Sequence, residues 1–125
     1  MDSIQQLIEL AEKKIERDKK GTWSKGSITY FQAMFDELEE VKIEMNSGRC
    51  CYLEDELGDI LWVYLCLLKN LESENEIDVE RVFRRAQQKY NERLSAINSG
   101  RSWSEVKERQ KSLLAQEHLI YSQKV

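Results

Sequence analysis

The sequence has no proline, a single histidine and three cysteines in a chain of 125 residues. Cys50, Cys51 and Cys66 have no metal-binding spacing, and their odd number favours reduced thiols and a cytoplasmic location. The sequence also lacks a glycine-rich phosphate loop, a nucleophile elbow and a His/Cys metal motif. It therefore offers no support for phosphate-loop, serine-nucleophile or zinc chemistry.

Long apolar segments are also missing. The apolar run over residues 60–68 is too short for a bilayer, which needs about 20 such residues. No apolar segment of signal-peptide length follows Met1, so we expect no membrane partner. The formal net charge of −4 argues against non-specific nucleic-acid binding. An anionic substrate would therefore need a local group of cations or a metal ion.

Amphipathic helix dominates what is present. Charged residues make up 34% of the chain and hydrophobic residues 41%, and strand-like alternation is scarce. The length suits one domain, residues 1–125. These features predict an all-α fold, an antiparallel bundle of four to five helices.

Hydrophobic periodicity places the helices at residues 3–18, 28–46, 52–71 and 79–97, with the last from Ser102 to about 120. Ser27 is predicted to be the N-cap of the second helix, and Ser102 and Glu105 have capping-box spacing. The third helix is apolar all round in its second half, which predicts a central position or burial against another subunit. The apolar residues of the fourth helix are expected to face inward: Val79, Val82, Phe83, Ala86, Tyr90, Leu94 and Ile97.

Two acidic pairs are the most informative motif. Glu37 and Glu40 lie three residues apart, as do Glu56 and Asp59, and residues at this spacing share a helix face. Asp59 also lies one turn before Val63 in the apolar run. Ionised carboxylates at the edge of a core are costly unless they are paired or bind a metal. The carboxylates therefore predict an all-oxygen site for Mg²⁺ or Mn²⁺, with a solvated acidic face as the alternative.

Cationic and aromatic residues provide a second group of candidates. Arg85, Lys89 and Arg93 follow one another at four-residue spacing on the fourth helix. Lys89 and Arg93 are candidates for phosphate binding, with a solvated basic face as the alternative. Trp23, in the connector 19–26, could stack on a nucleobase or fold over the core.

Together these residues resemble the MazG family of all-α nucleoside triphosphate pyrophosphohydrolases. Asp36-Glu37-x-x-Glu40 and Glu56-Leu57-Gly58-Asp59 are similar to the two halves of its signature, Glu-Glu-x-x-Glu and Glu-x-x-Asp. Residues 83–93 resemble its downstream helix, and residues 22–25 resemble its tryptophan-containing segment. Two positions depart from the family pattern: Asp36 replaces a glutamate, and Cys66 stands where many members have asparagine.

The resemblance implies a set of site residues. The metal ligands for Mg²⁺ (or Mn²⁺) would be Glu37, Glu40, Glu56 and Asp59. Lys89 and Arg93 would contact phosphate, and Trp23 and Lys25 would belong to the substrate-binding segment. Glu37 or Glu40 would orient or deprotonate the attacking water.

The resulting hypothesis is Mg²⁺-dependent hydrolysis of a nucleoside triphosphate, preferably a dNTP, to monophosphate and pyrophosphate. The resemblance also implies a homodimer or homotetramer and a role in nucleotide-pool house-cleaning. One alternative is a related pyrophosphohydrolase that acts on dUTP or phosphoribosyl-ATP. Another is a non-enzymatic helical interaction module whose acidic cluster is structural.

Overall fold

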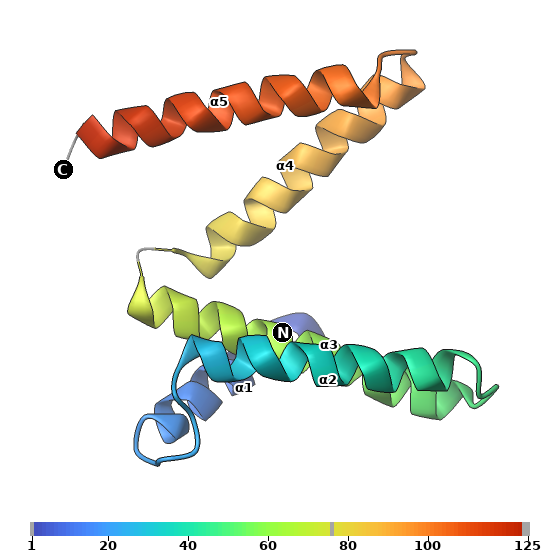
Figure 1. The fold of residues 1–125 in the computed structure, drawn as a ribbon, viewed down its shortest axis with the longest axis vertical. Helices are drawn as coiled ribbons and strands as arrows, with labels where there is room; N and C mark the ends of the chain where they lie inside the picture. Colours follow the sequence, from blue (N-terminus) through green and yellow to red (C-terminus); the bar gives the residue numbers. More distant parts are fainter. Residues whose placement is uncertain (1, 76, 124–125) are drawn as a thin grey trace. The chain divides into compact units, whose positions relative to one another are not determined.

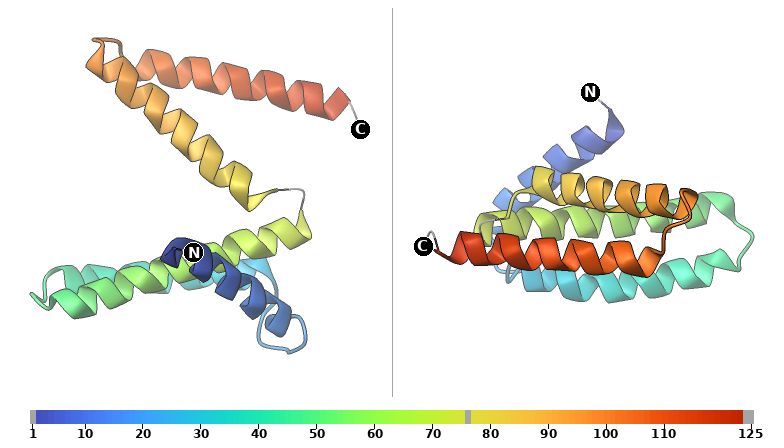
Figure 2. Two further views of the ribbon diagram at one scale, coloured as in Figure 1. Left: turned by 180° about the vertical axis from the view of Figure 1, so that it is seen from behind. Right: turned by 90° about the horizontal axis from the view of Figure 1, so that it is seen from above.

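The computed structural model of the protein describes residues 2–75 and 77–123, which form helices and no strand (Figures 1 and 2). The prediction of an all-α fold is confirmed. In chain order the helices are α1 (Ser3–Asp18), α2 (Ser27–Met45), α3 (Cys50–Glu74), α4 (Val79–Asn98) and α5 (Trp103–Gln123). They divide into two compact units, residues 1–79 and residues 80–125. The assignment of the whole chain to one domain stays a prediction.

Helix α3 is the centre of the first unit, because both α1 and α2 pack against it. The apolar side chains buried there come from all three helices: Ala11, Ile15, Tyr30, Val41, Val63, Leu65, Cys66 and Leu68. The apolar run that predicted a central helix therefore supplies much of this core. The helix also extends beyond its predicted ends, beginning at Cys50 and ending at Glu74.

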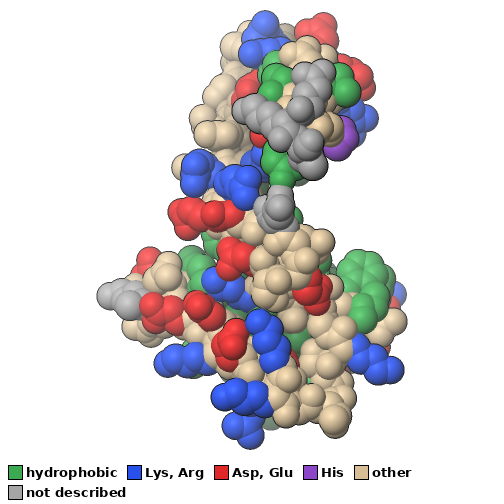
Figure 3. All heavy atoms as spheres, turned by 90° about the vertical axis from the view of Figure 1, so that its left-hand side faces the viewer, with side chains coloured by type: hydrophobic (Ala, Val, Ile, Leu, Met, Phe, Trp, Pro, Cys, Tyr) green, Lys and Arg blue, Asp and Glu red, His purple; other side chains and the backbone are tan. Residues whose placement is uncertain are grey.

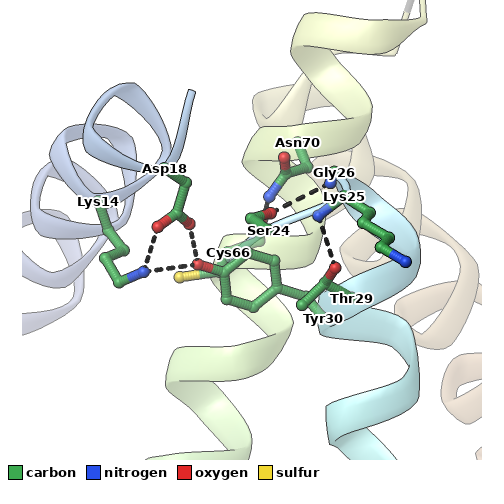
Figure 4. Close-up of polar contacts among 9 residues, drawn as sticks. All are labelled: Lys14, Asp18, Ser24, Lys25, Gly26, Thr29, Tyr30, Cys66 and Asn70. Atoms are coloured by element: carbon green, nitrogen blue, oxygen red, sulfur yellow. Dashed lines mark hydrogen bonds and ion pairs between the residues drawn. The ribbon is translucent and has the colours of Figure 1, made fainter. Parts of the chain in front are cut away.

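A network of hydrogen bonds and an ion pair connects α1 to α2 at the surface of this core (Figure 4). The Lys14 ammonium donates to Asp18 and, at 3.1 Å, to the Tyr30 hydroxyl. The Tyr30 hydroxyl in turn donates to Asp18, and the buried Cys66 thiol lies beside it. Burial, followed by the bond to Asp18, raises the pKa of Tyr30 well above its ordinary value, so the hydroxyl keeps its proton.

The start of α2 differs from the prediction. Ser27 is the first helical residue, and Gly26 occupies the N-cap position without a side chain to cap the helix. The Ser27 amide donates instead to Oε1 of Glu74, at 2.8 Å. A carboxylate from the end of α3 thus performs the capping that was expected of the Ser27 hydroxyl.

Polar side chains join α4 and α5 in the second unit. Arg85 donates two hydrogen bonds to the Glu117 carboxylate, at 2.7 and 3.1 Å, and Arg109 donates to Glu92 at 3.1 Å. The predicted cap of α5 is confirmed, since the Glu105 amide donates to the Ser102 hydroxyl at 3.2 Å.

The expected inward face of α4 is confirmed only at the start of the helix, where Val79 is buried and Val82 and Phe83 are half-buried. It is wrong farther along, where Ala86, Tyr90, Leu94 and Ile97 are exposed. Few apolar groups are buried in this unit, where Ala96 and Val106 are the buried hydrophobic residues among those described. Two ion pairs therefore join α4 and α5, which bury few apolar side chains among the described residues.

Charged side chains of both signs are interspersed on the face of the protein shown in Figure 3. The single histidine, His118, lies at the surface of α5. Among the helices of the described residues, none combines the length and apolar character needed to cross a bilayer.

Candidate metal centre

The α2–α3 pair brings the two acidic pairs together. Each of Glu37, Glu40, Glu56 and Asp59 offers one carboxylate oxygen, and these four oxygens all lie within 4.8 Å of one another. Three-residue spacing puts two carboxylates on one face of each helix, and the packing of α2 against α3 makes the two faces meet. The predicted ligand set is therefore a cluster in space as well as a pattern in sequence.

The cluster is electrostatically unfavourable in the absence of a cation. Oxygen Oε2 of Glu37 and Oε2 of Glu56 are buried and have no hydrogen-bond donor among the described residues. Burial raises the pKa of Glu37, and repulsion from Glu40 and Asp59 adds to the effect.

Glu56 shows the same effect more strongly. Burial is again the largest cause, and the contact with Glu40 and the negative charge of Asp59 also contribute. Together they raise the pKa of Glu56 to about 7. The raised pKa values of Glu37 and Glu56 are those expected of carboxylates that lack a positive partner.

A hard divalent cation fits this environment. All the donors are carboxylate oxygens, which Mg²⁺ and Mn²⁺ prefer, and the two buried oxygens without donors would become ligands. A simple solvated acidic face does not account for buried, donor-free oxygens. The chemistry of the donor set therefore agrees with a metal centre.

Trp23 projects from the connector before α2 and is 64% exposed, so it does not fold over the core. The Lys14 ammonium lies 4.4 Å from the centre of the indole ring. The Tyr30 ring packs edge-on against the indole, with 5.7 Å between the two ring centres. Lys25 is exposed, while its backbone amide donates to Thr29 at 2.8 Å. The connector thus presents an indole and an ammonium group next to the helix that carries Glu37.

Lys89 and Arg93 lie one turn apart on α4, in the second unit. Lys89 is exposed, whereas Arg93 is only 7% exposed. Within the described ranges, neither side chain forms an ion pair with a carboxylate, whereas Arg85 pairs with Glu117. Of the three cations in the predicted stripe, Arg85 is the one that a described carboxylate neutralises.

Two side chains that contact these candidates had no role in the predictions. Lys14 packs on Trp23, and Gln110 of α5 accepts a hydrogen bond from Nε of Arg93 at 2.8 Å. Lys14 and Asp18 have the four-residue spacing typical of a helical ion pair, so the sequence could have predicted that Lys14 has a fixed partner. No sequence spacing links Gln110 to Arg93, because the two residues belong to different helices.

The fold and the cluster define an all-α protein with a four-carboxylate centre between adjacent helices. The family model of the MazG nucleotide pyrophosphohydrolase domain matches residues 25–97. The match covers more than half of the chain, which therefore belongs to the MazG nucleotide pyrophosphohydrolase family. All four carboxylates, Lys89 and Arg93 lie within the matched range, and Trp23 and Gln110 lie outside it. No curated protein and no solved structure matched the chain.

Proposed function

We propose that the protein is a Mg²⁺-dependent nucleoside triphosphate pyrophosphohydrolase. It would convert a triphosphate and water into the monophosphate and pyrophosphate. The observation that supports this proposal is the convergence of four carboxylates, two with buried donor-free oxygens, in a chain of the MazG family. These carboxylates would hold Mg²⁺, or alternatively Mn²⁺. The cation, when bound, supplies neutralising charge for the triphosphate and makes a nearby water more acidic.

The protein side chains activate the attacking water and stabilise the leaving group. Glu37 or Glu40 orients or deprotonates the water that attacks the α phosphorus. The bond between the α phosphorus and the bridging oxygen breaks, and the electron pair leaves with pyrophosphate. Lys89 and Arg93 stabilise the charge on this leaving group. They suit the task because no carboxylate of the described residues neutralises them.

Trp23 and Lys25 form the proposed nucleotide-binding segment. The exposed indole provides a surface on which a base can stack, and Lys25 provides a cation beside it. We further propose a dNTP substrate, a cytoplasmic location and a role in nucleotide-pool house-cleaning. The family membership supports the substrate class and the role, and the unpatterned cysteines support the location.

A homodimer or homotetramer is the proposed assembly. Exposed apolar side chains recur along α2 at a spacing of three, four, three and seven residues: Ile28, Phe31, Phe35, Leu38 and Met45. We call these five side chains the α2 stripe. An exposed apolar stripe at helical spacing is unusual on a monomer, and a second copy of the same helix would cover it symmetrically.

Product analysis tests the proposed reaction. The protein is incubated with each common dNTP and NTP, with Mg²⁺ or with EDTA, and pyrophosphate is distinguished from orthophosphate. We expect metal-dependent monophosphate plus pyrophosphate, and loss of both in Glu56→Ala and Asp59→Ala. Full metal-dependent turnover by either variant would contradict the proposed site. Turnover of dUTP or phosphoribosyl-ATP alone would indicate a specialised enzyme, and no turnover would favour an interaction module.

A further inference from the structure

Arg93 is held in an unusual way for a charged residue. It is the one buried Lys or Arg side chain in the described part of the chain. Its Nε donates to Oε1 of Gln110 at 2.8 Å, and its Cζ lies 5.3 Å from the ring centres of both Tyr90 and Trp103. Two aromatic rings and one amide therefore surround the guanidinium group.

All of these partners are electrically neutral. A buried cation without a counter-ion loses hydration that neutral groups restore only in part. Two other arginines of the same unit do have a carboxylate partner, since Arg85 pairs with Glu117 and Arg109 pairs with Glu92. The environment of Arg93 thus fixes the side chain but leaves its positive charge available to an anion.

Gln110 contacts the guanidinium of Arg93 and the backbone of Lys89. Its Oε1 accepts from Arg93, and its Nε2 donates to the backbone carbonyl of Lys89 at 3.1 Å. A glutamine makes both contacts at once because its amide carries an acceptor and a donor. Gln110 engages Nε, and no hydrogen bond from the two terminal nitrogens of Arg93 to another described residue competes with a ligand. They form the edge of the guanidinium that binds phosphate in a forked geometry.

We infer that Gln110 is a positioning residue that holds Arg93, without neutralising it, for the pyrophosphate portion of the substrate. This inference rests on the proposed function, in which Lys89 and Arg93 bind phosphate. Tyr90 and Trp103 assist by fixing the plane of the guanidinium through cation–π contacts. Gln110 lies beyond the range that the family model matches.

Gln110→Glu is the most informative variant. It keeps the size of the side chain and the acceptor for Arg93, but it adds a negative charge and removes the donor to Lys89. We expect the new ion pair to compete with phosphate, so that KM and the dissociation constant of inorganic pyrophosphate each rise at least about tenfold. The same ion pair should leave Tm unchanged or raise it. A purely structural role for Gln110 predicts the same Tm but no change in pyrophosphate binding.

Two further variants complete the test. Gln116→Glu adds the same charge to an exposed position of α5, and it should bind pyrophosphate like the wild type. Gln110→Leu removes both hydrogen bonds without adding charge. We expect it to weaken pyrophosphate binding less than Gln110→Glu, although it lowers Tm more. The opposite order of pyrophosphate affinities would overturn the inference.

Direct binding of inorganic pyrophosphate, measured by calorimetry with Mg²⁺, separates this inference from the proposed function. If the wild type hydrolyses nucleotides and Gln110→Glu matches it in KM and in pyrophosphate binding, the inference is wrong and the function stands. If the wild type turns over no nucleotide but binds pyrophosphate through Gln110 and Arg93, the function is wrong and the inference stands. Neither turnover nor binding by the wild type would overturn both.

Discussion

One carboxylate oxygen of Glu40 on α2 and one of Glu56 on α3 lie within 4.8 Å of each other. Two negative charges this close repel each other, which favours protonation of one of the two carboxylates. In agreement, the pKa of Glu56 is raised to about 7. Protons and a divalent cation are therefore alternative ways to relieve the same repulsion, and this competition makes the centre sensitive to pH.

The metal-free protein should become less stable as pH rises from the ordinary glutamate range to neutrality. The pKa of Glu56 is 4.5 in the unfolded chain and about 7 in the fold, so the folded state retains a proton that the unfolded state has lost. The stabilisation from this proton is complete below pH 4.5 and is lost as pH rises through about 7. Urea unfolding in EDTA, at about pH 5 and about pH 8, measures the decline.

Added Mg²⁺ should reverse this loss at the higher pH, because a cation that binds only the folded state stabilises it. Glu44, Glu72 and Glu117 have lowered pKa values, so their contributions are lost below pH 4.5, outside this window. Equal stability at both pH values in EDTA would contradict the assignment of a raised pKa to Glu56.

Glu56→Gln should separate stability from activity. The amide removes one negative charge from the cluster, so the metal-free variant should be more stable than the wild type at about pH 8. The same change removes a ligand, and we expect a loss of turnover of at least about a hundredfold. Glu54→Gln, on the exposed surface of the same helix, serves as the control and should change neither property. Wild-type activity in Glu56→Gln would exclude this carboxylate from the centre.

The carboxylate cluster was predictable because local rules determine it. Helical spacing puts Glu37 beside Glu40 and Glu56 beside Asp59, and a helix pair with a short connection brings such faces together. The cap of α2 was not predictable, since Glu74 lies 47 residues from the Ser27 amide that it binds.

The surroundings of Arg93 were likewise not predictable from the sequence. Its spacing from Lys89 marks it as a member of a charged stripe, which is ordinarily solvated, yet Tyr90, Trp103 and Gln110 enclose it. Helical periodicity gives the direction of a side chain from its own helix. It does not give the partner that another helix supplies.

Gly26→Ala should destabilise the protein. Gly26 has a φ of 92°, and a Cβ atom there would lie 2.3 Å from Oε1 of Glu74, the oxygen that caps α2. Backbone strain of this kind costs about 1–3 kcal/mol, and displacement of the Glu74 carboxylate adds to it. Urea unfolding measures the change in the free energy of unfolding.

Gly58→Ala is the matched control for this substitution. Gly58 lies inside α3, and no atom of the described residues comes within 4 Å of a Cβ built there. Alanine should therefore raise the free energy of unfolding by about 0.5–1 kcal/mol through its helix propensity. Opposite signs for the two variants would support both arguments, and a neutral Gly26→Ala would contradict the first.

Lys14→Met should loosen the attachment of α1 to α2. The variant keeps most of the aliphatic stem but leaves the buried Asp18 carboxylate with the Tyr30 hydroxyl and no cation. Loss of a charged partner from a buried group costs about 1–3 kcal/mol. The contact with the Trp23 ring also disappears. Lys13→Met, at the neighbouring exposed position, is the control, and equal stability of the two variants would show that the network contributes little.

Phe35→Glu should disrupt the proposed assembly through the α2 stripe. Phe35 is 58% exposed, and its ring meets that of Phe31 edge-on at 5.4 Å, so the two rings form one apolar surface. A carboxylate in the middle of a symmetric interface would face its own copy and remain desolvated, which is strongly unfavourable. Light scattering at micromolar concentration should therefore show a lower mass for this variant than for the wild type. Ile43→Glu, an equally drastic change at an exposed position of α2 outside the stripe, should keep the wild-type mass. A monomeric wild type, or the same mass for all three proteins, would contradict the proposed interface.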